Sequence, residues 1–144
     1  MTSTTTPSRL RTRLALWLTG VGTASSLLIS ACSVAAPPSV TVQQAREQAS
    51  AGQAVLIDVR EPDEAAAVRP PGSTLIPLAQ LAKRLAELPQ DKSTPVLLIC
   101  RSGNRSSAAT DLLQKAGYTQ ARNVSGGMNA WEQAGLPVQR GAAR

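Results

Sequence analysis

The sequence predicts an α/β domain in which a central parallel sheet is covered by helices on both faces. Short apolar runs typical of strands alternate with amphipathic runs typical of helices, and this alternation favours parallel strands joined by crossing helices. Two of the apolar runs, 54–57 and 96–99, contain no polar residue, as expected of strands buried on both faces. A chain of 144 residues has room for one such domain and a tail.

The first half of the domain is expected to begin with a helix and continue into a buried strand. Thr41 is suited to cap a helix that runs to about Gly52. The strand at 54–57 ends in a charged segment, 58–64. Within that segment Pro62 suits the first position of a second helix, and acidic residues fill the first turn, where the helix dipole favours negative charge.

The second half is expected to add further strands and helices. Four leucines spaced three or four residues apart predict a single helix over 78–88 with a buried apolar stripe. Another helix, over about 106–116, is predicted to bury Ala108, Leu112 and Leu113. The remaining expected elements are a strand at 74–76, a strand within 118–124, and a last helix carrying Met128, Ala130 and Trp131.

Residues 1–31 have the pattern of a secretory signal peptide. Residues 1–13 carry three arginines and no acidic residue, and a short apolar run follows over 14–29. Small residues come next, as in a signal that is removed after export. We therefore expect the domain to lie outside the cytoplasm.

Residues 29–32, Ile-Ser-Ala-Cys, resemble the lipobox of bacterial lipoproteins. The resemblance implies cleavage before Cys32, lipidation of Cys32, and a membrane-anchored lipoprotein of the cell envelope that faces the periplasm. The alternatives are cleavage after Ala35, which would give a soluble periplasmic or secreted protein, and an uncleaved anchor. The predicted division is a signal peptide at 1–31, a tether at 32–40, the folded domain at 41–139 and a disordered tail at 140–144.

The composition excludes several classes of function. The chain has no histidine and two cysteines, which excludes Cys–His and Ser–His catalysis and argues against a zinc site. The net charge of +6 includes the three arginines of the signal segment, and the rest of the chain has 12 basic against 9 acidic residues. No basic run with interleaved aromatic residues is present, so nucleic-acid binding is not expected. Nothing in the sequence indicates more than a monomer.

Cys100 is the candidate nucleophile. It follows the strand at 96–99 and precedes a helix, so loop N–H groups and the positive helix end should converge on its sulfur. Arg101 and Arg105 add positive charge, and all three effects favour the thiolate. The same loop would hold a tetrahedral oxyanion. The alternative is a buried structural cysteine beside solvated arginines.

Two further residues of opposite charge follow the other apolar strand. Asp58 and Arg60 come at the end of the run 54–57, on the edge where open parallel sheets place their sites. We expect them to form a structural pair that fixes this loop, with a catalytic role as the alternative. The acidic residues of 61–64 are expected to cap the following helix or to be solvated.

Three separated segments, 58–62, 100–106, and 126–131 with 135–138, resemble the single-domain rhodaneses in sequence, order and spacing. The resemblance covers about 41–138. It implies a sulfurtransferase in which Cys100 carries the sulfur as a persulfide and no metal or organic cofactor is needed. The donor-binding residues implied are Arg101, Ser102, Gly103, Asn104, Arg105 and Ser106.

The resemblance also implies a two-step reaction. The Cys100 thiolate takes the outer sulfur of a thiosulfate-like anion, and a thiol or cyanide then collects it. The chain departs from the family pattern where Ala65 occupies an aromatic position and where Val-Arg-Pro at 68–70 replaces Gly-His-Ile. This departure bears on the pocket rim and the natural substrate.

Two other functions remain open from the sequence. A Cys-dependent phosphatase or arsenate reductase needs five residues between cysteine and arginine, whereas four separate Cys100 from Arg105. A non-catalytic module that carries persulfide or docks onto an envelope partner is favoured by the altered segment 65–70. Hydrolysis of an aryl phosphate would support the first alternative, and sulfur loading without turnover would support the second.

Overall fold

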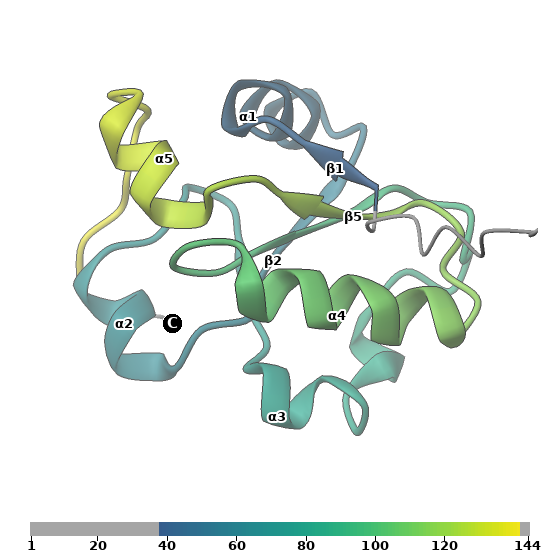
Figure 1. Ribbon diagram of the computed structural model, residues 1–144. Helices are drawn as coiled ribbons and strands as arrows, with labels where there is room; N and C mark the ends of the chain where they lie inside the picture. Colours follow the sequence, from purple (N-terminus) through teal and green to yellow (C-terminus); the bar gives the residue numbers. More distant parts are fainter. Residues whose placement is uncertain (1–37, 142–144) are drawn as a thin grey trace, which may run out of the picture. The chain divides into compact units, whose positions relative to one another are not determined.

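The computed structural model describes residues 38–141, which form a central parallel sheet with helices on both faces, as predicted (Figure 1). The sheet has five strands in the order β1-β5-β4-β2-β3, and every neighbouring pair is parallel. The strands are β1 (Ser39–Val40), β2 (Val55–Asp58), β3 (Thr74–Leu75), β4 (Val96–Ile99) and β5 (Ala121–Val124).

The helices cover the two faces of the sheet. Helices α1 and α5 pack together on one side and α3 and α4 on the other (Figure 1). Within residues 38–141, no helix is both long enough and apolar enough to cross a membrane. The helices are α1 (Val42–Ser50), α2 (Pro62–Ala67), α3 (Leu78–Leu81), α4 (Asn104–Lys115) and α5 (Gly127–Gln133), with a 3₁₀ turn, η1 (Leu85–Glu87).

Strand β4 shows why the core has two layers. Side chains alternate between the faces of a strand, so Leu97 and Ile99 pack with the core under α1 and α5, while Val96 and Leu98 pack with the core under α4. All four are fully buried. A run without polar residues is therefore what this central strand requires.

The domain begins earlier than predicted. Residues Ser39 and Val40, assigned to the tether, form β1 and pair with Asn123 and Val124 of β5. Two residues are too short a run for a pattern of alternation, but Val40 is buried in the core, which explains why it is ordered there. The predicted cap is confirmed, since the Thr41 hydroxyl accepts a hydrogen bond from the backbone N–H three residues on.

The C-terminal boundary also extends beyond the prediction. Arg69 and Gln139 form an isolated antiparallel bridge with two backbone hydrogen bonds of 2.9 and 2.8 Å. Gly141 then donates a hydrogen bond of 2.9 Å to the carbonyl of Ala66 in α2. The first two residues assigned to the tail are thus placed beside α2, and the signal peptide, Cys32 and residues 142–144 lie outside the described residues.

The single helix predicted over 78–88 is wrong, although its leucine stripe is buried as expected. The chain forms α3, then η1, with Arg84 outside helical geometry at φ −112° and ψ 22°. Leu81 and Leu88 are buried in the core, and the other two leucines pack against it. The four leucines reach the core through tight turns, in which backbone bonds join residues three apart.

Helix α4 differs from the prediction in its start and in one buried position. It begins at Asn104, two residues before the predicted Ser106. Ala108 is exposed, and the next residue, Ala109, is buried together with Leu113. The earlier start brings the first turn of α4 to the cysteine loop, which shapes the site described below.

Candidate active site

Cys100 lies at the junction that the sequence predicts, between β4 and α4. The residue is 1% exposed. Gly103 caps α4 with φ +105°, a backbone conformation that glycine adopts without strain. This turn brings the N-terminal end of α4 next to the sulfur, where the helix dipole favours negative charge.

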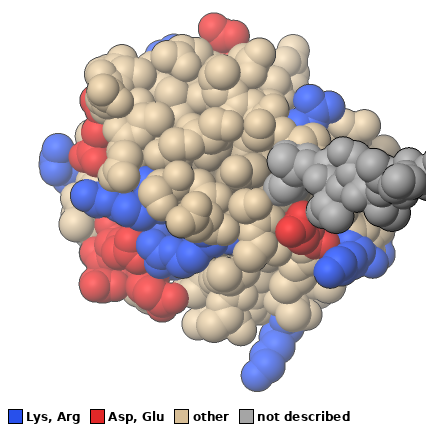
Figure 2. Space-filling view, in the orientation of Figure 1, with Lys and Arg blue, Asp and Glu red and all other residues tan. Residues whose placement is uncertain are grey.

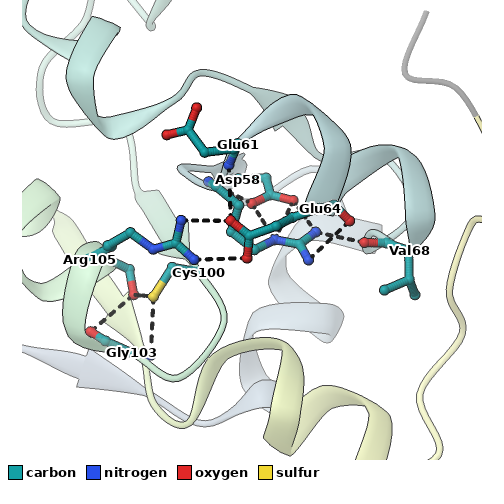
Figure 3. A network of polar contacts seen from close by, with 9 residues as sticks. Asp58, Glu61, Glu64, Val68, Cys100, Gly103 and Arg105 are labelled. Carbon is teal, nitrogen blue, oxygen red and sulfur yellow. Dashed lines mark hydrogen bonds and ion pairs between the residues drawn. The ribbon is translucent and has the colours of Figure 1, made fainter.

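The Cys100 sulfur accepts hydrogen bonds from the loop that surrounds it. The Gly103 N–H lies 3.1 Å from Sγ and the Ser106 hydroxyl 3.3 Å (Figure 3). Burial of the thiol raises its pKa, but hydrogen bonds from the Ser106 hydroxyl and from the backbone of Ser106, Gly103 and Ser102 outweigh it and lower the pKa below the ordinary cysteine value. The loop therefore favours a nucleophilic thiolate, as predicted.

Helix α5 holds the other side of the loop. The N–H groups of Met128 and Asn129 donate to the carbonyls of Cys100 and Arg101 at 2.8 and 3.0 Å. A side chain on Gly127 would collide with the Cys100 carbonyl, so the approach depends on this glycine. Because both carbonyls turn toward α5, the loop presents N–H groups rather than carbonyls to the sulfur.

Arg105 is engaged by an acidic partner that the sequence did not identify. Its two terminal nitrogens bond both carboxylate oxygens of Glu64 at 2.7 and 2.9 Å (Figure 3). The hydrogen bonds from Arg105 lower the pKa of Glu64, and the Glu64 carboxylate in turn raises the pKa of Arg105, with a smaller contribution from the Cys100 charge. Arg105 thus supports the thiolate electrostatically while its guanidinium is already paired.

The acidic and basic side chains around this pair form a mixed surface. Figure 2 shows red and blue side chains adjacent at the left of the view, over α2 and the neighbouring loop. Glu64 and the backbone N–H of Glu61 also bond at 3.3 Å, which caps α2 as predicted. Glu64 lies on the segment after β2 and Arg105 on the segment after β4, and these strands are neighbours in the sheet. The opposite charges of the two segments were a usable signal for the contact between Glu64 and Arg105.

The predicted Asp58–Arg60 pair is present and buried. The Arg60 Nε and Nη2 atoms bond the Asp58 carboxylate at 2.5–3.1 Å. Arg60 also donates to the carbonyls of Val68, at 2.7 Å, and Glu64, at 3.5 Å, near the end and in the first turn of α2. The pair therefore fixes α2 beside the loop and does not touch the sulfur.

The remaining predicted residues of the loop are placed as follows. Arg101, Ser102 and Asn104 are exposed at its surface. Asn123 of β5, which sequence reasoning missed, lies 2.7 Å from the Ser106 hydroxyl through its Oδ1 atom. An isolated asparagine before a strand end carries no signal of such a role.

Within residues 38–141, no cluster of three or more His, Cys, Asp or Glu side chains could hold a metal ion.

A cavity of about 510 Å³ lies apart from this loop. It is bordered by the C-terminal half of α1, the start of β2 and Trp131 of α5, and no residue of 100–106 lines it. The chemistry is therefore assigned to the cysteine loop, where nucleophile, hydrogen-bond donors and charge converge, and not to the cavity. The lining residues are Arg46, Ala49, Ser50, Ala54, Val55, Leu56, Pro71, Gly72, Trp131 and Pro137.

The chain is similar in sequence to known proteins over most of its described residues. The model of the rhodanese-like domain family matches residues 41–134. A sulfurtransferase of Allochromatium vinosum is 37% identical over 84 residues, covering 58% of this chain and 77% of that protein. The human thiosulfate:glutathione sulfurtransferase is 34% identical over 110 residues, covering 68% of this chain and 96% of that protein.

Solved structures give the same result. The thiosulfate sulfurtransferase of Pseudomonas aeruginosa superimposes with a TM-score of 0.68 at 31% identity, covering 75% of this chain and 21% of that one. A human single-domain sulfurtransferase has a TM-score of 0.60 at 30% identity, covering 67% of this chain and 96% of that one. The chain belongs to the rhodanese-like domain family, which confirms the resemblance found in the sequence.

Proposed function

We propose that this chain is a sulfurtransferase that moves a sulfane sulfur from a thiosulfate-like anion to a thiol or cyanide. The observation that carries the proposal is the Cys100 sulfur, which accepts hydrogen bonds from Gly103 and Ser106 at the N-terminal end of α4. Hydrogen bonds from the loop lower the pKa of Cys100 below the ordinary cysteine value, which favours the thiolate. The sulfurtransferase relatives support the same class of reaction.

The reaction proceeds in two displacements. The Cys100 thiolate attacks the outer sulfur of the donor, the S–S bond of thiosulfate breaks, and sulfite leaves with the electron pair. A negatively charged Cys100 persulfide remains, held by the N–H groups of the loop. A thiolate or cyanide then attacks the outer sulfur, giving a new persulfide or thiocyanate and returning the Cys100 thiolate.

Residues of the loop have distinct roles in this proposal. Gly103 and Ser106 stabilise negative charge on the sulfur by hydrogen bonds. Arg101 and Asn104 are exposed at the mouth, where they can meet an anionic donor. Arg105 contributes its charge while paired with Glu64. This pairing weakens the phosphatase alternative, which requires an arginine free to grip the anion with both nitrogens.

The test is the intact mass of the chain before and after thiosulfate. We expect a gain of one sulfur atom, which cyanide removes as thiocyanate. In the matched control Cys100→Ser, which is nearly isosteric, the gain should disappear while the circular dichroism spectrum stays unchanged. No gain in the wild-type chain with thiosulfate or polysulfide would contradict the proposal. A gain that no thiol or cyanide removes would favour the non-catalytic carrier.

We also propose that the chain is exported and held at a membrane of the cell envelope, facing the periplasm, by lipid on Cys32, and that it acts there as a monomer. The support is the signal-like segment 1–31 and the lipobox-like sequence 29–32. Cys100 is the free cysteine of the described residues. The change Cys32→Ala should release the protein from membranes or block its maturation, and unchanged attachment would indicate an uncleaved anchor.

A further inference from the structure

The Ser106 hydroxyl lies among three acceptors and has one proton to donate. Its Oγ atom is 3.3 Å from the Cys100 sulfur, 3.2 Å from the Gly103 carbonyl oxygen and 2.7 Å from Asn123 Oδ1. A serine hydroxyl donates a single hydrogen bond but accepts others. The shortest of these contacts is with Asn123 and not with the sulfur, so Asn123 in this orientation competes with Cys100 for the hydroxyl proton.

Asn123 is held by its main chain, and among residues 38–141 its side-chain amide bonds only the Ser106 hydroxyl. Its backbone N–H donates to the Pro38 carbonyl at 2.9 Å, and β5 pairs with β1 and β4 around it. Among residues 38–141, no hydrogen bond holds its Nδ2 atom. The two ends of an amide have the same shape and opposite hydrogen-bonding character. A half-turn of the amide therefore replaces the acceptor facing Ser106 by a donor.

The two orientations have opposite consequences for the sulfur. With Oδ1 toward Ser106, Asn123 competes with the Cys100 sulfur for the single hydroxyl proton. With Nδ2 toward Ser106, the Ser106 oxygen accepts from the amide and its proton is free to point at Cys100. A hydrogen bond to a thiolate is stronger than one to a neutral thiol, so ionisation of Cys100 and rotation of the amide are coupled.

We propose that Asn123 is a positioning residue whose side-chain amide directs the Ser106 proton either to itself or to the Cys100 sulfur. Asn123 does not touch the sulfur and acts through Ser106. The inference rests on the proposed function, because the thiolate is the form that attacks the donor. It concerns the ionisation of Cys100 alone, so it can be tested without a sulfur donor.

Charged side chains and backbone N–H groups lie on the segments that adjoin the loop. Helix α5 contributes backbone N–H groups to the loop, and Arg122 of β5 bonds Gln120. A substitution of Asn123 leaves the chemical identity of these N–H groups and of Arg122 the same. The charged residues on the segments after β2 and β4 and on α2 are Asp58, Arg60, Glu61, Asp63, Glu64, Arg101 and Arg105.

The test is Asn123→Asp, made in the wild-type chain and in Ser106→Ala. An ionised aspartate accepts the Ser106 proton with either oxygen and cannot return a donor, but it also adds a negative charge. The Ser106→Ala background removes the relay and leaves that charge, so it is the matched control. The readout is the pH midpoint of Cys100 alkylation by iodoacetamide, followed on the Cys100 peptide by mass spectrometry.

We expect Asn123→Asp to raise the midpoint by about one pH unit in the wild-type chain, the size of a lost hydrogen bond to a charged group. In Ser106→Ala the same change should raise it by less than about half as much. Equal shifts in both backgrounds, or no shift in the wild-type chain, would overturn the inference, because Asn123 would then act by charge alone or not at all.

A second variant keeps the test decisive if Asn123→Asp does not fold. Asn123→Leu has a similar volume and neither donates nor accepts, so Ser106 keeps its proton for Cys100 or Gly103. Its midpoint should lie within about half a unit of the wild-type value. A rise of one unit or more would overturn the inference. Normal alkylation without sulfur loading from thiosulfate would contradict the proposed function and leave this inference intact.

Discussion

Two ion pairs hold α2 to the rest of the domain, and they differ in burial. The Asp58–Arg60 pair lies beneath α2 with side chains 1% and 0% exposed. The Glu64–Arg105 pair lies at the mouth of the cysteine loop with side chains 27% and 35% exposed. Both are bonds between a carboxylate and a guanidinium, so the surroundings account for the difference in their roles.

The buried Asp58–Arg60 pair stabilises the position of α2, whereas the half-exposed Glu64–Arg105 pair affects the electrostatic field at the active site. A buried charge without its partner is costly, because protein groups must replace the water it has lost. Arg60 also donates to carbonyls of Val68 and Glu64, so it fixes the backbone of α2. Water and salt screen the second pair. Burial therefore separates a pair that positions α2 from one that sets the field at the active site.

The largest effect is expected from Arg60→Met. This change leaves the buried Asp58 carboxylate without its cationic partner and the Val68 carbonyl without the Arg60 donor, and it should lower the free energy of unfolding by about 3–5 kcal/mol. Urea denaturation followed by circular dichroism measures it. A loss below about 1 kcal/mol would mean that burial does not separate the two pairs.

The double variant Asp58→Asn with Arg60→Met is the matched control. It removes both charges, so part of the stability lost in Arg60→Met should return. Recovery should stay incomplete because Arg60 also serves the Val68 and Glu64 carbonyls. A double variant less stable than Arg60→Met would show that packing, and not the unpaired charge, dominates.

The sequence predicted the buried pair but not the half-exposed one, and the reason is physical. Asp58 and Arg60 are two residues apart at a strand end, so local pattern places them together. Glu64 and Arg105 are 41 residues apart, and their contact depends on β2 and β4 lying side by side. The hydrogen bond from the Ser106 hydroxyl to Asn123 likewise depends on the position of β5, so only the tertiary structure reveals it.

Local and long-range information also explain the errors in the fold. Cys100, its strand and its loop follow from apolar runs and turn residues, and they were predicted. Strand β1 has two residues, and its burial comes from pairing with β5. The break between α3 and η1 satisfies the same leucine spacing as one helix, so periodicity alone did not reveal it.

A smaller effect is expected from Glu64→Gln. The loss of a half-exposed pair should lower the free energy of unfolding by less than about 1 kcal/mol after solvent screening. The freed Arg105 guanidinium should then meet the anionic donor, lowering the KM for thiosulfate about two- to fivefold at low salt. Steady-state kinetics at two ionic strengths measures this. A raised KM would show that the pair, and not free Arg105, forms the donor site.

The stability change in Glu64→Gln should depend on pH in a defined direction. Hydrogen bonds from Arg105 lower the pKa of Glu64 in the folded state, so this carboxylate stabilises the fold above its ordinary pKa of about 4.3. That contribution is lost as pH falls through the lowered pKa. The urea midpoints of wild type and Glu64→Gln should therefore differ at neutral pH and converge in acid, and a gap that widens in acid would contradict this assignment.

The smallest effect is expected from Glu87→Gln, the same change in a third ion pair. Glu87 bonds Arg84 at 2.5 and 2.6 Å, yet both side chains lie at the surface, 47% and 32% exposed. Short contacts in water contribute little, because solvent competes for each charge. We expect no measurable change in the urea midpoint. A loss as large as that of Glu64→Gln would mean that contact geometry, rather than burial, ranks the ion pairs of this domain, and the comparison between the two pairs of α2 would then fail.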